Sequence, residues 1–80
     1  MRQVTVQFFA AFREAAGTAS EQVATDADSV GELFVEMTQR FQGLEREPAA
    51  LVAINDEMSE WGAQFAEGDV ILFFPPVAGG

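Results

Sequence analysis

The residues with the most specific chemistry lie at the end of the chain, which reads Pro75-Pro76-Val77-Ala78-Gly79-Gly80. The two prolines stiffen the start of this segment, and the two glycines lack a Cβ, so the tip can pass through a narrow channel. At about 3.3 Å per extended residue, the segment reaches roughly 20 Å beyond a folded domain. We therefore expect a tail that carries the α-carboxylate of Gly80 into another protein's active site. The alternative is a terminus of small residues without a function.

The α-carboxylate itself needs help before it can react. With a pKa of roughly 3.5 it is ionised near neutral pH, and an ionised carboxylate is a poor electrophile. It must be activated before it accepts sulfur or an amine. The sequence has no glycine-rich loop ending in Lys-Ser or Lys-Thr that would cradle a phosphate. We therefore expect a partner enzyme to supply the nucleotide chemistry.

Four residue types that enzymes use most often are missing, because the chain has no His, Cys, Lys or Tyr. The thiol and amine nucleophiles, the base that titrates near neutral pH and the soft metal ligands are therefore absent, and an enzyme would have to work with Asp, Glu, Ser, Thr and Arg alone. Paired carboxylates can also catalyse reactions, but no spacing marks such a pair. We expect no catalytic machinery and no metal site. Without Cys, a thiocarboxylate at Gly80 is the remaining covalent site for sulfur, although compositional drift would leave the same gaps.

Composition and charge limit the partners. Eighty residues form one domain, and 49% hydrophobic residues with eight Phe suffice for a compact core. Thirteen acidic residues against four basic ones give a net charge of -9, which repels phosphate backbones and anionic membranes, so we expect neither nucleic acid nor membrane as a partner. The charge favours a basic partner surface or, equally, a solubilising shell. No apolar stretch approaches the roughly 20 residues that span a bilayer, so we expect a soluble, cytoplasmic protein.

The elements that must position the tail begin with a strand. From Val4 to Phe9 the chain has a period of two, which predicts a strand: Val4, Val6 and Phe8 alternate with Thr5, Gln7 and Phe9. Residues Ala10 to Ala16 predict a short helical turn that stops at Gly17. A weaker strand is expected over Ser20 to Thr25.

The main helix has clear signals. Ser29, followed three residues later by Glu32, is typical of a capping box at a helix start. Apolar residues then recur at spacings of three and four, which gives one apolar helical face. These residues are Val30, Leu33, Phe34, Met37 and Phe41. We expect Gly43 to close the helix.

A hairpin is predicted next. Leu51 to Ile54 is a short apolar strand that meets Asn55-Asp56, two residues that tolerate a tight turn. The returning strand is expected to include Met58 and Trp61.

The last strand determines where the tail starts. After the turn Glu67-Gly68-Asp69, residues Val70 to Phe74 are apolar on both faces, which places this strand at the centre of a sheet. Pro75-Pro76 then ends the strand, because proline cannot donate to a ladder. The order of elements predicts an α+β fold, with a mixed sheet around one main helix over residues 1–74 and an extended tail over 75–80.

Three stretches carry a family resemblance. They are Phe8-Phe9-Ala10-Ala11-Phe12-Arg13-Glu14 with Gly17-Thr18, then Val52-Ala53-Ile54-Asn55, and finally Gly68-Asp69 with Phe73-Phe74-Pro75-Pro76-Val77-Ala78-Gly79-Gly80. Length and element order extend the match over the whole chain, and the ending is its most specific part. In these features the chain resembles the small subunits of molybdopterin synthase, a family of ubiquitin-like sulfur carriers.

The resemblance implies a β-grasp fold and a carrier that is not itself an enzyme and binds no cofactor. An E1-like enzyme would adenylate Gly80 with ATP, and a sulfur donor protein would then convert it to a thiocarboxylate. Gly79, Ala78 and Val77 would insert into the large synthase subunit, with Phe74, Pro75 and Pro76 at the interface. There the sulfur would convert cyclic pyranopterin monophosphate to molybdopterin, within a heterotetramer of two small and two large subunits.

Two related functions stay open. One is a β-grasp sulfur carrier for thiazole, cysteine or transfer-RNA thiolation, although Pro75-Pro76 argues mildly against the thiazole pathway. The other is a ubiquitin-like protein modifier, which the resemblance disfavours because Ala78 stands where such modifiers usually have Arg before the terminal glycines.

Overall fold

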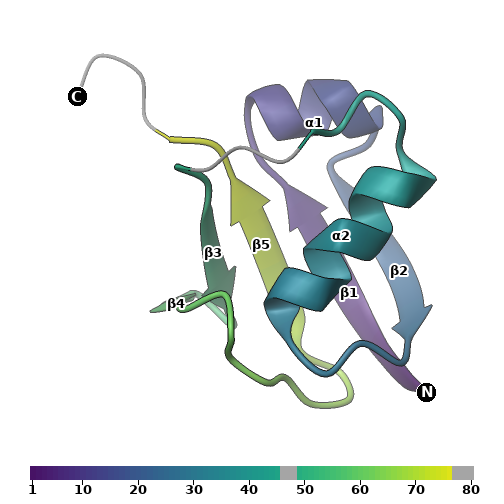
Figure 1. The fold of residues 1–80 in the computed structure, drawn as a ribbon, viewed down its shortest axis with the longest axis vertical. Coiled ribbons are helices and arrows are strands. Elements are labelled where there is room, and N and C mark those ends of the chain that lie inside the picture. Colours follow the sequence, from purple (N-terminus) through teal and green to yellow (C-terminus); the bar gives the residue numbers. More distant parts are fainter. Residues whose placement is uncertain (46–48, 77–80) are drawn as a thin grey trace.

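The computed structural model describes residues 1–45 and 49–76. Within these ranges one five-stranded sheet, in the order β2-β1-β5-β3-β4, carries helix α2 across one face (Figure 1). The elements are β1 (Arg2–Phe8), α1 (Ala11–Ala16), β2 (Ser20–Thr25), α2 (Val30–Arg40), β3 (Leu51–Ile54), β4 (Glu57–Ser59) and β5 (Val70–Phe74). Strand β5 pairs with β1 in parallel, and the other pairings are antiparallel. The predicted α+β class with a mixed sheet is confirmed.

The first two strands form as the sequence predicts. Val4, Val6 and Phe8 turn their side chains into the core, and Thr5 and Gln7 face the other way. The second predicted strand is also confirmed, since β2 spans Ser20–Thr25 and pairs with β1 over its whole length.

Helix α1 closes one end of the core with the buried ring of Phe12. The predicted stop is confirmed, because Gly17 adopts a left-handed conformation with φ 77° and donates its N–H to the carbonyl of Arg13 at 2.9 Å. The start was not predictable. Ala10 has φ 53° and ψ -124°, which places a residue with a Cβ where glycine is preferred.

Helix α2 begins at the predicted cap, because the hydroxyl of Ser29 accepts the backbone N–H of Glu32 at 3.2 Å. The prediction for its end was wrong. The helix ends at Arg40, and Phe41 is extended, which brings its ring edge-on against Phe8 at 5.6 Å between centroids. Gly43 has another role, because a Cβ there would lie 2.8 Å from the carbonyl oxygen of Ala15.

The hairpin between β3 and β4 turns at Asn55 and Asp56, both with positive φ, as the sequence predicts. The expected extent of the returning strand was wrong, since β4 ends at Ser59 and Trp61 lies beyond it. The Trp61 ring instead stacks on Phe73, with centroids 5.9 Å apart and an interplanar angle of 5°. A large ring gains more from this contact than from a position on an edge strand.

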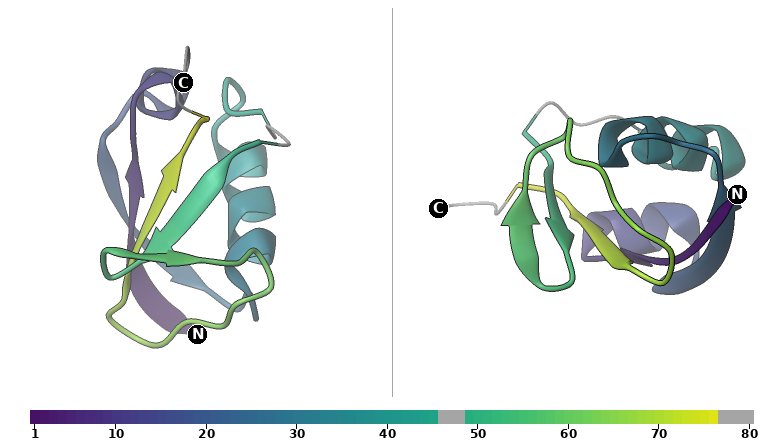
Figure 2. Two further views of the ribbon diagram at one scale, coloured as in Figure 1. Left: turned by 90° about the vertical axis from the view of Figure 1, so that its left-hand side faces the viewer. Right: turned by 90° about the horizontal axis from the view of Figure 1, so that it is seen from below.

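Strand β5 lies third of the five strands, so its predicted central position is confirmed. Ile71 and Phe73 are fully buried against α2, whereas Leu72 and Phe74 on the other face are only partly buried. Figure 2 shows the reason: α2 runs along one face of the sheet, and none of the described elements covers the other face.

Among residues 1–45 and 49–76, no helix combines the length and the apolar character that crossing a bilayer would require.

Candidate functional site

The site begins where β5 ends. Phe74 is the last residue of β5, the partly buried Pro75 and the exposed Pro76 follow it, and neither proline has an N–H to extend the ladder. The chain therefore leaves the sheet from its central strand, at the end of the molecule opposite to Met1 (Figure 1). Of the predicted site residues, the structure places these three.

The remaining predicted site residues are Val77, Ala78, Gly79 and Gly80, and they lie outside the described residues. The tail and the boundary at residue 74 therefore stay predictions.

The register of the sheet shows which residues surround the start of the tail. Leu51 lies directly across from Phe74 on the uncovered face, and in the next row Ala53 lies between Leu72 and Met58. Phe9 follows β1 directly and donates its N–H to the carbonyl of Phe73 at 3.1 Å, so it lies beside the end of β5. We call Phe9, Leu51, Met58, Leu72 and Phe74 the apolar patch.

The apolar patch is unusually accessible for side chains of this size. Phe9 is 60% exposed, Met58 62% and Leu51 39%. Ala53 is buried without belonging to the core cluster, because its neighbours on the same face cover it. A set of exposed apolar side chains on one face is typical of a protein interaction site.

At the strand positions that the structure describes, the uncovered face carries no charged residue, although the chain has a net charge of -9. Three charged residues lie in the strands, and by the register all three are on the face that α2 covers: Arg2, Glu21 and Glu57. Depletion of charge distinguishes the centre of a protein interface from the rest of a surface. The polar strand residues of this face are Gln3, Thr5, Gln7, Ser20 and Gln22. Of these, Gln22 donates to the hydroxyl of Thr5 at 2.9 Å.

A network of side-chain hydrogen bonds holds the opposite end of β5 in place. The side-chain oxygen of Asn55 accepts the N–H of Val70 at 2.9 Å, and its amide group donates to Asp69 at 3.0 Å. Asp69 also accepts the N–H of Ala66 at 2.8 Å. Both hydrogen bonds lower the pKa of the Asp69 carboxyl, and the one from the Ala66 backbone has the larger effect. The network fixes the start of the strand whose other end leads into Pro75 and Pro76.

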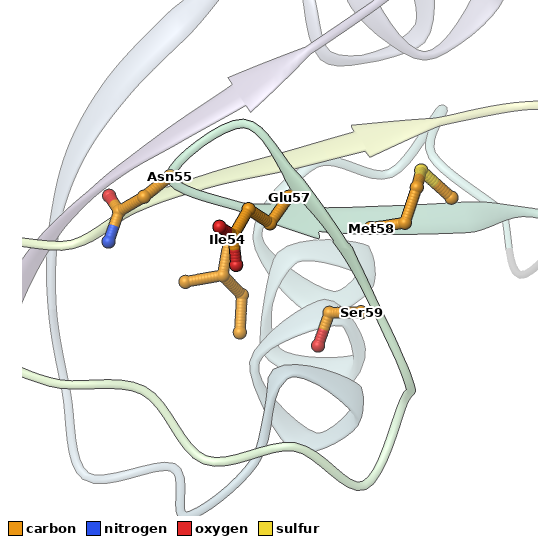
Figure 3. Close-up of a pocket in the computed structure, with 5 residues that line it drawn as sticks. All are labelled: Ile54, Asn55, Glu57, Met58 and Ser59. Atoms are coloured by element: carbon orange, nitrogen blue, oxygen red, sulfur yellow. The ribbon is translucent and has the colours of Figure 1, made fainter.

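Among the described residues that line the hollow beside the hairpin, Glu57 is the single ionisable side chain, so no pair of carboxylates meets there. Ile54, Asn55, Glu57, Met58 and Ser59 line it, with Met58 and Ser59 pointing to opposite sides of β4 (Figure 3). The amide of Asn55 is already engaged with Asp69 and Val70. Nowhere in the described part of the chain do three metal-ligating side chains lie close enough together to hold an ion.

The sequence led us to predict Phe74 and the two prolines at an interface, but not that Phe9, Leu51, Met58 and Leu72 share one surface with Phe74. The sequence did contain one signal for this surface, since Val70 to Phe74 is apolar on both faces. Apolar side chains on the outward face indicate that a partner or a second layer of structure covers them. The register across β3 and β4 cannot be read from one strand alone.

The sequence profile of the ThiS family matches residues 6–80. The chain belongs to the ThiS family. A curated relative, the molybdopterin synthase sulfur carrier subunit of Escherichia coli (strain K12), is 34% identical over 80 residues, which cover 96% of this chain and 99% of that protein.

Solved structures of related proteins agree with this family assignment. The small archaeal modifier protein 1 of H. volcanii matches with a TM-score of 0.84 and 26% identity, covering 96% of this chain and all of that one. The complex of subunits 1 and 2 of the molybdopterin-converting factor from Helicobacter pylori 26695 contains a chain that matches with a TM-score of 0.67 and 28% identity, covering 98% of this chain and 99% of that one. The fold of this ThiS-family chain is thus the ubiquitin-like β-grasp, as expected.

Proposed function

We propose that this ThiS-family chain is the sulfur carrier subunit of a molybdopterin synthase. The thiocarboxylate of Gly80 donates the sulfur that converts cyclic pyranopterin monophosphate to molybdopterin. The observation that carries the proposal is the match to the E. coli carrier subunit along nearly the full length of both chains. The geometry supports it, because the central strand leads to the predicted tail at the edge of an uncharged apolar patch.

Activation proceeds in two steps on partner proteins. The Gly80 carboxylate attacks the α-phosphorus of ATP in an E1-like enzyme, which releases pyrophosphate and leaves an acyl adenylate. A sulfide equivalent from a sulfur donor protein then displaces AMP, so that one carboxyl oxygen leaves with AMP and sulfur takes its place. The chain itself binds no cofactor. Because it has neither Lys nor Cys, no side chain of a neighbouring copy competes as an amine or thiol nucleophile.

Sulfur transfer takes place on the large synthase subunit. Residues 75–80 act as the tail, of which Val77, Ala78 and Gly79 thread the channel while Phe74, Pro75 and Pro76 seal its mouth. The rest of the apolar patch packs against the large subunit beside that mouth. The solved complex of the two molybdopterin-converting factor subunits supports a partner of this kind. The catalytic residues belong to the large subunit, in a heterotetramer with two copies of each chain in the cytoplasm.

A second candidate function is protein modification. It is favoured by the likeness to the small archaeal modifier protein 1, which has a higher TM-score than the chain in the converting-factor complex. The same activated Gly80 would then be attacked by a lysine amine of a target and form an isopeptide bond. Ala78 before the terminal glycines argues against this function.

Reconstitution separates the candidates. The thiocarboxylated chain is mixed with a large synthase subunit and cyclic pyranopterin monophosphate, and the pterin product is followed by mass spectrometry. We expect a pterin that has gained two sulfur atoms, with two carrier chains returned to the carboxylate. No sulfur transfer to the pterin, together with boiling-resistant conjugates in cells, would favour the modifier.

A further inference from the structure

The three methionines differ sharply in exposure. Met37 is 2% exposed inside the core, whereas Met58 is 62% exposed and Met1 86%. Oxidation of a thioether by a hydroperoxide follows access to the sulfur. Two of the three sulfur atoms are therefore reactive in the free chain, and only Met58 belongs to the apolar patch.

Met58 occupies a position where a polar group would be costly. It lies across from Ala53, which is buried although it is outside the core, and the next residue in the same row is Leu72. Figure 3 shows its side chain on the side of β4 away from Ser59. None of the five described strands places a charged residue on this face. A sulfoxide that is buried here against a partner would lose its hydration, and its row neighbours Ala53 and Leu72 have no side-chain donor to replace it.

We propose that Met58 is a reversible oxidation site that controls docking of the carrier, an inference that rests on the proposed function. A hydroperoxide transfers one oxygen atom to the Met58 sulfur, so the thioether is oxidised to a sulfoxide while the peroxide is reduced to water or an alcohol. The sulfoxide weakens docking of the apolar patch on the large subunit. A methionine sulfoxide reductase with a thiol reductant restores the thioether and releases the oxygen as water.

The consequence is chemical as well as regulatory. A thiocarboxylate is also sensitive to oxidants. When the same oxidant converts Met58 to the sulfoxide, the carrier docks more weakly, so a smaller amount of its damaged sulfur reaches the synthase. Bound to the large subunit, Met58 is covered and stays reduced. Free and bound carrier therefore differ in their response to the same oxidant.

The test compares the wild-type chain with Met58→Leu, which keeps the apolar side chain and also keeps Met1 as an internal control. Both chains are treated briefly with hydrogen peroxide, and peptide mapping locates the added oxygen. Mapping is needed because a sulfoxide and a thiocarboxylate change the intact mass almost equally. We expect oxygen on Met58 and Met1 but not on Met37, and protection of Met58 when the large subunit is present.

Affinity for the large subunit is then measured by calorimetry. We expect oxidised wild type to bind about tenfold or more weakly than reduced wild type. The affinity of Met58→Leu, whatever its starting value, should be the same with and without peroxide treatment. Equal binding by oxidised and reduced wild type, or a reduced Met58 beside an oxidised Met1, would overturn the inference. Failure of the reduced chain to bind any large subunit would overturn the proposed function, whereas the peptide map tests the reactivity of Met58 independently.

Discussion

The backbone N–H of Gly31 donates to the carbonyl oxygen of Trp61 at 2.9 Å, and a Cβ on Gly31 would lie 2.9 Å from that same oxygen. Val30 donates to Ala63 at 3.0 Å in the same way, and Ser29 accepts from Glu32. The loop after β4 and the Ser29 cap together satisfy the first four donors of α2, which leaves no vacant anion site at this helix start. It also fixes the loop that places the Trp61 ring on Phe73 of the central strand.

Substitution of Gly31 by Ala tests this contact. The added methyl cannot be accommodated without moving the Trp61 backbone, so we expect a loss of about 1–3 kcal/mol in the free energy of unfolding, measured by urea denaturation. Gly62→Ala is the matched control, because a Cβ there meets nothing within 4 Å. If both variants were equally stable, the close approach would not constrain the fold.

Substitution of Ala10 by Gly should stabilise the protein. Ala10 has φ 53° and ψ -124°, a region that glycine occupies without strain. Relief of that strain exceeds the entropy that glycine adds to the unfolded chain, and we expect a gain of about 1 kcal/mol in thermal or urea unfolding. The complementary variant Gly17→Ala places a Cβ at φ 77° in open space and should cost about 1 kcal/mol. A loss of stability in Ala10→Gly would contradict the strain.

The apolar patch is tested by Phe9→Ala. Phe9 is 60% exposed, so truncation leaves the fold intact, but it removes an aromatic side chain next to the start of the tail. We expect about tenfold or greater loss of affinity for the large synthase subunit, measured by calorimetry. Val35→Ala is the control, because Val35 is 43% exposed on α2, away from this face. Equal weakening by both variants would mean that the patch is not the docking surface.

The acid limb of stability should depend on Asp69. Its pKa is lowered in the folded state, so its contribution to folding is present above the unfolded pKa of about 4 and disappears as the pH falls through the lower folded value. Asp69→Asn should therefore be less stable than the wild type at pH 6, and the difference should shrink as the pH approaches 2. Urea melts across this range measure it. A difference that stays constant with pH would show that the carboxylate charge does not contribute.

The sequence was sufficient to predict an element where its local pattern of apolar residues matches the side chains that are buried in the fold. The alternation from Val4 to Phe8 and the Ser29 cap predicted their elements, and the two-faced Val70–Phe74 run predicted the central strand. Each of these patterns lies within one segment and is compatible with only one type of secondary structure.

The failures involve contacts between distant segments. Gly43 was a reasonable helix stop, yet contact with Phe8 turns Phe41 out of the helix first. Trp61 followed a strand pattern, yet Phe73 and Gly31 hold it in a loop. The apolar patch likewise depends on how β1, β3, β4 and β5 pair, which no single stretch of sequence encodes. The positive φ of Ala10 has no sequence signal either, because the position holds alanine and not glycine.

The most direct test concerns the terminal carboxyl group of Gly80. The chain is incubated with an E1-like adenylating enzyme, ATP and a sulfur donor, and the C-terminal peptide is analysed by mass spectrometry. A Gly80-deleted variant and a known sulfur carrier are treated in parallel. We predict that one oxygen of the Gly80 carboxyl is replaced by sulfur, and that the deleted variant is unchanged. An unaltered C-terminal peptide, under conditions that convert the known carrier, would contradict the proposal that this chain carries sulfur.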